Sequence, residues 1–394
     1  MNPMEFDKAY FDAGVRRVGT ECEKWDGMMT RTGDADMIPM WVADMDFPSA
    51  PAIAKALGDV LSWGTWGYTI AGEKDAEALC AYWARRHGMQ LSPDEVLMSP
   101  CVITGMRVAL RTLTKEGDGV LINPPVYGPF FQSIRLNNRR VVESPLVRGE
   151  DGRFCMNLTE MEEKLASGEA RAVMICSPHN PVGRSWDEDE LSAVVSLCER
   201  YDAPLICDEI HADFVYAPKK HRCILSIPGA QARAVMLCAA SKTFNVAGLQ
   251  QSSIVCRNPE MLEKMRHEME AGGVKSGNAF ALAATRAAYT DCDAWLDGLV
   301  AYLTDNRDFA VKYIAEHMPH VRVTPLEATY LMWLDCSALG MAQSTLMEKI
   351  AAAHVMVNDG TIFGEQAKGF IRLNIGCPRP QLALALERMA TVLG

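Results

Sequence analysis

Short apolar runs alternate with amphipathic stretches through the middle of the chain. The apolar runs have the length and the branched side chains of buried strands, and they occupy 119–123, 172–176, 204–207, 234–238 and 252–256. Apolar positions at helical spacing fill 105–114, 187–201 and 259–271. This order is typical of a mostly parallel sheet covered by helices on both faces. We therefore predict an α/β fold with functional loops at the carboxyl ends of the strands.

The pattern changes toward both ends of the chain. From about residue 280 a helical pattern runs to 318, and strand-like segments at 322–335 and 369–375 precede a closing helix. The first 45 residues or so hold few periodic apolar positions and several Gly, Asp and Pro breaks, so we expect an irregular arm that wraps over the larger unit. We predict a large domain at 49–280 and a smaller α+β domain formed by 281–394 with the arm, 1–48.

Length and charge narrow the class of protein. With 394 residues, 49% of them apolar, the chain exceeds the size at which single cores usually stop growing. The net charge is −11 and both signs are interspersed, which argues against nucleic acid as a partner. The chain start lacks a basic segment followed by an apolar core, and no run of about 18 uncharged apolar residues occurs. We expect a cytoplasmic protein without membrane association.

Several common catalytic motifs are missing. The sequence has no G-x-G-x-x-G, no Walker A loop and no G-x-S-x-G, and His267-Glu268 lacks a second His four residues later. The 13 cysteines are scattered without a Cys-x-x-Cys pair, which favours reduced core thiols. Nucleotide-binding, serine-hydrolase and zinc-protease functions lose support, and we expect no metal site.

Polar residues of the types that a pyridine aldehyde phosphate requires follow the predicted strands instead. Lys242, in AASKTFNVAGL, comes shortly after the strand at 234–238 and has small neighbours that would admit a bulky ring. An amine near apolar surface has a lowered pKa suited to imine formation. A surface lysine is the alternative interpretation of this residue taken alone.

Two further polar residues end predicted strands. Asp208, in APLICDEIHADF, is a carboxylate that would be costly to bury without a partner, and a protonated pyridine nitrogen is such a partner. Asn180, in ICSPHNPVG, lies in a turn restricted by two prolines and a glycine, where its amide could donate to a phenolic oxygen. An N-cap aspartate and an ordinary turn asparagine are the alternatives.

An aromatic residue and a helix start complete this set. Tyr127, in INPPVYGPF, lies past another strand end and could stack on a pyridine ring. Val102 and Ile103 precede a predicted helix whose free amide groups suit a phosphate. Each of these observations is weak alone.

Taken together and in order, N-P-x-x-Y, S-P-x-N-P-x-G, D-E-I-H and S-K-T-F-N resemble the fold type I pyridoxal 5′-phosphate (PLP) enzymes of the class I/II aminotransferase superfamily. The chain is more narrowly similar to their cystathionine β-lyase (C–S lyase) branch of the MalY/PatB type. That likeness rests on KWD at 24–26, PMWVADMDF at 39–47, Trp-Gly-Tyr at 66–68, DEIHADF at 208–214 and SKTFNVAGLQ at 241–250. The resemblance implies PLP as cofactor and a large domain with a mostly parallel, seven-stranded sheet.

The resemblance also implies a role for each matched residue. Lys242 is similar to the lysine that holds PLP as a Schiff base, Asp208 to the partner of the pyridine nitrogen and Tyr127 to the stacking ring, and these three are the implied catalytic residues. Further implied cofactor contacts come from Asn180, His211, Ser241, Val102, Ile103 and Tyr68. Tyr68 resembles a tyrosine that reaches the phosphate in the neighbouring subunit, which implies a homodimer with shared active sites. Arg372 resembles the arginine that binds the substrate α-carboxylate, and Trp41 and Asp44 are expected to shape the substrate pocket.

The implied activity is cleavage of L-cystathionine or another S-substituted cysteine to a thiol, pyruvate and ammonia. An aminotransferase would use the same residues, and a lyase with a second, regulatory protein-binding role is a further alternative. The sequence departs from the broader aminotransferase pattern at Ala239, where many members have Ser, at Gln250, where many have a phosphate-binding Arg, and at Ala328, where relatives often have Gly.

Overall fold

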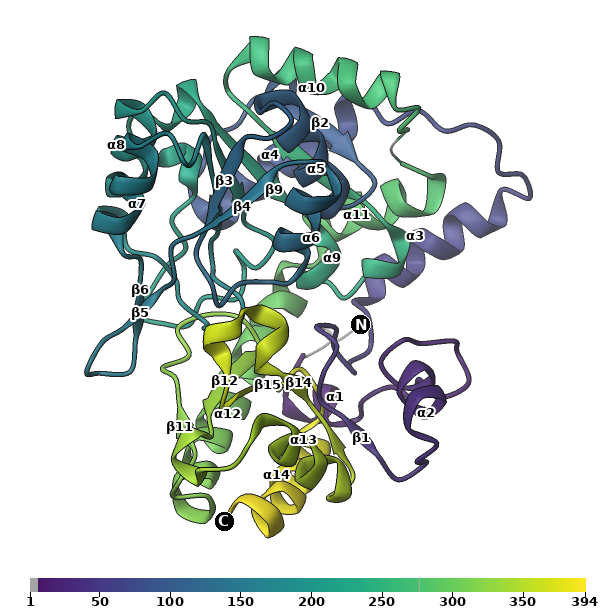
Figure 1. Ribbon diagram of the computed structural model, residues 1–394. Coiled ribbons are helices and arrows are strands. Elements are labelled where there is room, and N and C mark those ends of the chain that lie inside the picture. Colours follow the sequence, from purple (N-terminus) through teal and green to yellow (C-terminus); the bar gives the residue numbers. More distant parts are fainter. Residues whose placement is uncertain (1–5, 276) are drawn as a thin grey trace.

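The computed structural model describes residues 6–275 and 277–394, and its largest sheet has seven strands (Figure 1). The strand order is β2-β10-β9-β8-β7-β3-β4. Neighbouring strands from β9 to β4 are parallel, whereas β10 runs antiparallel to both β2 and β9. The predicted mostly parallel sheet is confirmed. Its strands are β2 (Val96–Ser99), β3 (Gly119–Ile122), β4 (Arg140–Glu143), β7 (Ala172–Cys176), β8 (Leu205–Asp208), β9 (Ala234–Cys238) and β10 (Ser252–Val255).

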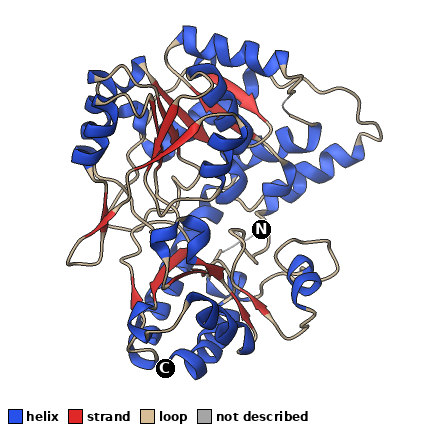
Figure 2. Cartoon of the chain, in the orientation of Figure 1, coloured by secondary structure: helices blue, strands red, loops and turns tan. Residues whose placement is uncertain are grey.

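Alternate residues of the central strands pack against opposite helical layers, which Figure 2 shows on either side of the sheet. In β7, Val173 and Ile175 belong to one apolar cluster, and Met174 belongs to the other. Because both faces are covered, these strands are apolar throughout, as the sequence pattern required. One layer comprises α4 (Glu73–His87), α7 (Leu158–Ala166), α8 (Glu188–Arg200) and α11 (Ala279–Asp291); the other comprises α5 (Val102–Leu113), α6 (Pro129–Leu136) and α10 (Pro259–Ala271).

The five strands predicted for the middle of the chain agree with the structure to within one residue at each end. The helix expected at 105–114 begins three residues earlier, at Val102, with Cys101 as its N-cap. Its first turn contains the β-branched residues Val102, Ile103 and Thr104, which have no marked helical preference and concealed the helix start. Because the helix starts at Val102, its free amide groups lie at the edge of the sheet where the parallel strands end.

A four-stranded antiparallel sheet forms the C-terminal part, in the order β11-β12-β15-β14. The helical pattern expected from 280 to 318 is interrupted at Cys292, where α11 ends and α12 (Asp293–His317) begins. The break lets α11 pack on the larger sheet's layer while α12 continues beside α14. The other elements here are β11 (Arg322–Val323), β12 (Leu331–Asp335), α13 (Gln343–Ala352), β13 (Val355–Met356), β14 (Asn358–Asp359), β15 (Phe370–Asn374) and α14 (Arg379–Leu393). The two-domain boundaries stay a prediction.

The N-terminal arm packs mainly on the C-terminal part, and it reaches the larger unit, over which it was expected to wrap, through contacts of Ala43 and Met45. Strand β1 (Ile38–Pro39) pairs with β13, and Phe11 packs among Phe47, Trp295 and Tyr302. The arm also contains short helices α1 (Lys8–Asp12) and α2 (Asp26–Thr32) and leads into α3 (Pro51–Ser62). Its first five residues lie outside the described part of the chain. Within that part, no helix combines the length and apolar character that crossing a membrane requires.

Candidate active site

Loops after β3, β7, β8 and β9 and the start of α5 enclose a cavity of about 210 Å³. Because β3, β7, β8 and β9 are parallel neighbours, their carboxyl ends share one edge of the sheet. The cavity brings together eight of the residues singled out from the sequence: Val102, Ile103, Tyr127, Asn180, Asp208, His211, Ser241 and Lys242. Ala43, Cys101, Cys176, Ile210, Ala247, Gln250 and Gln251 complete its wall.

Lys242 lies in the short helix α9 (Ala240–Thr243), directly after β9. Its Nζ donates a hydrogen bond of 2.7 Å to the carbonyl oxygen of Ala43. Withdrawal from water lowers the pKa of Lys242 to about 8, with Asp44 and Asp208 opposing this shift and Arg372 adding to it. A substantial fraction of this amine is therefore uncharged in mildly alkaline solution, as a nucleophile or base requires.

Asp208 is the last residue of β8 and is buried, with 3% of its surface exposed. Its Oδ1 accepts a hydrogen bond of 3.1 Å from the backbone N–H of Ile210. Burial raises the pKa of Asp208 to about 7, because this single hydrogen bond and the Lys242 charge compensate only part of the lost hydration. The carboxyl group is thus poised to ionise fully when a cation is placed beside it.

Asn180 and Arg372 contact each other at the side of the cavity. Arg372 Nη1 donates to Asn180 Oδ1 at 2.9 Å, and its Nη2 donates to the Trp41 carbonyl and to Asn358. The Arg372 Nε is buried and has no hydrogen-bond partner among the described residues. Burial lowers the pKa of Arg372 to about 10, which leaves the guanidinium charged at neutral pH. Arg372 does not line the cavity itself.

Two aromatic side chains with shifted pKa values line the cavity. Burial, reinforced by the charges of Lys242 and Arg372, lowers the pKa of His211 to about 3, so the imidazole is neutral. Burial also raises the pKa of Tyr127, which keeps its phenol protonated. The buried His211 Nδ1 has no hydrogen-bond partner in the described part of the chain.

The cavity end near α5 offers anion-binding groups. The first amide groups of this helix, at Val102 and Ile103, have no partner within the helix and carry its positive dipole end. Ser241 adds a hydroxyl and Gln250 an amide to the same cavity. A phosphate group fits this donor set.

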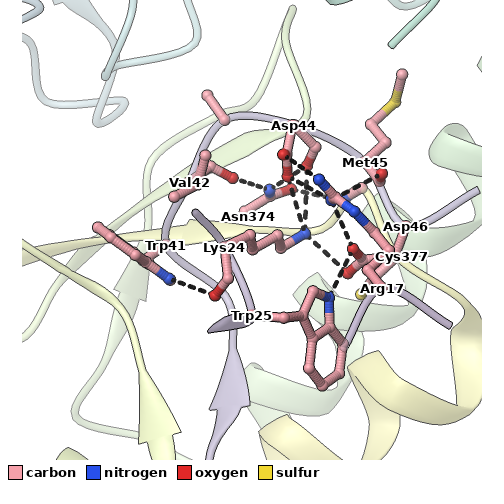
Figure 3. Close-up of polar contacts among 12 residues, drawn as sticks. Arg17, Lys24, Trp25, Trp41, Val42, Asp44, Met45, Asp46, Asn374 and Cys377 are labelled. Carbon is pink, nitrogen blue, oxygen red and sulfur yellow. Dashed lines mark hydrogen bonds and ion pairs between the residues drawn. The ribbon is translucent and has the colours of Figure 1, made fainter. Parts of the chain in front are cut away.

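The side chains of Trp41 and Asp44 do not enter the cavity, contrary to their expected role in substrate binding. The Trp41 indole N–H donates to the Lys24 carbonyl, and its ring lies under the Arg31 guanidinium. Asp44 binds Arg17 at 2.6 Å and faces Lys24, as Figure 3 shows. Arg17 and Lys24, both in the arm, hold this carboxylate in ion pairs. The Ala43 carbonyl of this segment accepts a hydrogen bond from Lys242.

Tyr68 does not contribute to the cavity of its own chain. Its side chain is fully exposed, on the loop between α3 and α4 that extends away from the larger sheet in Figure 1. Lys275 lies over its ring at 5.9 Å.

Several residues of the cavity wall were not among those predicted from the sequence. Cys101 and Ile210 adjoin predicted site residues along the chain, and Cys176 ends the predicted strand that leads to Asn180, so their positions could have been inferred. The Ala43 carbonyl was not identifiable, because a backbone contact from a segment about 200 residues away leaves no mark in the local pattern.

A profile of the class I and II aminotransferases matches residues 35–389, which include every residue of the cavity wall. The chain belongs to this family. It is 36% identical to cystathionine beta-lyase PatB of Bacillus subtilis, over 97% of this chain and 99% of that protein. It is 33% identical to protein MalY of Escherichia coli, over 94% of this chain and 95% of that protein.

The solved structures include a family relative at nearly full length. Cystalysin from Treponema denticola, whose crystal structure contains a pyridoxal 5′-phosphate cofactor, superimposes with a TM-score of 0.94. It is 30% identical and the alignment covers 97% of this chain and 98% of that chain. The family membership and the fold inferred from the sequence resemblance are confirmed.

Proposed function

We propose that this protein binds PLP through Lys242 and cleaves the carbon–sulfur bond of L-cystathionine or related S-substituted cysteines. The observation that supports this most strongly is the presence of the Lys242 amine and the buried Asp208 carboxyl group in one cavity. The relatives named as cystathionine β-lyases, similar over nearly the whole chain, favour C–S cleavage over other reactions of the family.

The donor groups of the cavity fit PLP. Asp208 is buried without a cation in ion-pair contact among the described residues, and a protonated pyridine nitrogen would supply that cation. Tyr127 offers an aromatic face, Asn180 and His211 offer polar atoms for the ring substituents, and the α5 start suits the phosphate. When bound, PLP supplies an electron sink that stabilises negative charge at the α carbon of an amino acid.

The residues of this chain then have distinct tasks. Lys242 would hold the cofactor through its aldehyde and, as a free amine, would remove the α hydrogen of the substrate as a base. Asp208 would hold the proton on the ring nitrogen, and Arg372 would bind the substrate carboxylate. The thiolate leaves the β carbon and takes a proton. With one water consumed, the products are a thiol, pyruvate and ammonia.

Product counting separates this lyase from an aminotransferase. Purified protein is loaded with PLP and mixed with excess L-cystathionine in the absence of any keto acid. A lyase releases pyruvate and homocysteine in equal amounts over many turnovers per chain. An aminotransferase stops after one turnover with the cofactor in its amine form and yields no pyruvate, which would contradict the proposal.

Replacement of Arg372 by Lys is expected to raise KM for cystathionine about 10- to 100-fold, with a smaller change in kcat. The ammonium cannot make the paired contact that a planar guanidinium makes with a carboxylate, and a charged hydrogen bond is worth roughly 1.5–3 kcal/mol. Steady-state kinetics measure both constants. Arg322→Lys, at an exposed position on β11 of the same sheet, is the matched control. An unchanged KM in Arg372→Lys would exclude this carboxylate contact.

We also propose that two copies of the chain form a dimer with shared active sites. The segment around Tyr68 exposes a group of large apolar side chains, which is unusual for a surface in contact with water. They are Leu61, Trp63, Trp66, Tyr68 and Ile70, all more than half exposed. A second copy would cover them and place Tyr68 near the partner's α5 start.

Mixing two inactive variants tests this sharing. Lys242→Ala and Tyr68→Ala chains are unfolded together, refolded and assayed. Each hybrid dimer holds one site with both residues intact, so the mixture is expected to recover about a quarter of wild-type activity. Activity no greater than the sum of the two separate variants would show that each site is formed by one chain.

A further inference from the structure

The segment from Trp41 to Asp46, here called the strap, crosses beside Lys242 and is held by hydrogen bonds along its backbone. The Ala43 carbonyl accepts from Lys242 Nζ at 2.7 Å and from the Tyr330 hydroxyl at 3.0 Å. Asn245 bonds both the N–H and the carbonyl of Met45. The strap therefore supplies the acceptor that fixes the direction of the Lys242 amine.

Four charged side chains form a cluster beside the strap, with Lys24 and Asp46 buried and Arg17 and Asp44 partly exposed, as Figure 3 shows for their contacts. Lys24 is fully buried, and its Nζ lies 2.8 Å from Asp46 Oδ2, 3.7 Å from Asp44 Oδ1 and 3.2 Å from the Asp44 carbonyl. Arg17 contacts Asp44 at 2.6 Å and Asp46 at 3.0 Å. With two cations and two carboxylates, the cluster is neutral.

Asp46 is the buried carboxylate of the cluster and contacts both Lys24 and Arg17. It is 1% exposed and also accepts hydrogen bonds from the Trp25 indole and the Gln381 amide. Burial opposes its ionisation, yet the neighbouring Lys24, Trp25 and Arg17 hold its pKa below the usual range. A fully satisfied, charged network of this kind restricts the strap to one position.

Asp44 connects the cluster to the active site electrostatically. Its charge raises the pKa of Lys242, as that of Asp208 does from β8, whereas the charge of Arg372 on β15 lowers it. His211 is neutral, so it adds no charge to those that act on Lys242. Arg17 and Lys24 offset the charge of Asp44, so the cluster sets how much of it Lys242 experiences.

We propose that Lys24 is a positioning residue for Lys242, holding the strap through Asp44 and Asp46 and offsetting the charge of Asp44, the residue next to the carbonyl that Lys242 binds. This inference rests on the proposed role of Lys242. Its test, however, reads the protonation of Lys242 and requires neither PLP nor the reaction.

The experiment measures the pKa of Lys242 in the full chain freed of cofactor. Competitive acetylation with acetic anhydride, from about pH 6 to about pH 10, is quantified by mass spectrometry of the peptide that contains Lys242. Lys24→Met and Arg17→Met each leave the cluster with a net negative charge, so the midpoint is expected to rise by about one pH unit. Asp44→Asn leaves a net positive charge, and the midpoint is expected to fall by about one pH unit.

Two controls separate this effect from general damage to the fold. Lys24→Arg keeps the charge and should keep the wild-type midpoint, as should Lys55→Met at an exposed site on α3. Loosened packing alone would not move the midpoint in opposite directions for opposite charge changes. If Lys24→Met does not fold, Arg17→Met and Asp44→Asn decide the matter. Identical midpoints in these variants and the wild type would overturn the proposal.

Discussion

Replacement of Lys242 by Ala is expected to abolish C–S cleavage, with kcat/KM for cystathionine falling by about 10⁴-fold or more. The variant loses both the amine that bonds the cofactor and the base that removes the α hydrogen, and the second function alone is typically worth about 10²–10⁴-fold. Pyruvate formation measures the loss. The visible absorbance of the PLP-loaded protein should lose its imine band at the same time.

Two variants sharpen this result. Lys242→Arg preserves a cation of similar length, but a guanidinium does not release its proton at any working pH, so this variant should be equally inactive. Lys55→Ala removes an exposed lysine from α3 and should behave as wild type. Substantial pyruvate formation by Lys242→Ala would assign the chemistry to another group.

Replacement of Asp208 by Asn is expected to lower kcat by about 10²–10³-fold, as loss of a preorganised electrostatic contact to the reacting system usually does. The amide cannot keep a proton on the pyridine nitrogen, so the cofactor becomes a weaker electron sink. Asp213, five residues later, is a carboxylate that contacts His87, Tyr82 and Thr243 outside the cavity wall. Asp213→Asn is the control, and its kcat should fall much less.

The same variant should be more stable than wild type when no cofactor is bound. The folded-state pKa of Asp208 is about 7, above the ordinary aspartate value of 3.8, so the unfolded chain binds fewer protons at this site between those values. The wild-type free energy of unfolding therefore falls as pH rises from about 4 to about 7 and then levels, whereas Asn contributes no such slope. Denaturant unfolding of cofactor-free protein measures this difference. A less stable, fully active Asp208→Asn would contradict the assignment.

Much of the cavity could be predicted from the sequence because parallel strands bring their carboxyl ends to one edge. Lys242, Asp208, Asn180 and Tyr127 each follow an apolar run, and the structure places all four around one cavity. Their roles needed the family resemblance, because a strand end by itself does not say which ligand is bound. The start of α5 was predicted three residues too late, because the β-branched residues of its first turn weaken the helical pattern.

The contribution of the arm could not be predicted in this way. Lys24 and Asp46 are charged, so the sequence alone predicts that they lie on the surface. Charged residues are rarely fully buried unless they are paired, as these two are. Their pairing depends on how the arm packs against the C-terminal part, which no local periodicity encodes. Asp44 contacts Arg17 and the Trp41 indole contacts the Lys24 carbonyl, so neither side chain lies in the cavity wall.

The central claim is that the cavity at the edge of the larger sheet is the cofactor site and that Lys242 holds PLP there. Borohydride reduction of the PLP-loaded protein, followed by proteolysis and mass spectrometry, tests it directly because reduction makes the lysine–cofactor bond permanent. We predict a single pyridoxyl phosphate adduct, on the peptide that contains Lys242. An adduct on a different lysine, or none, would contradict the claim.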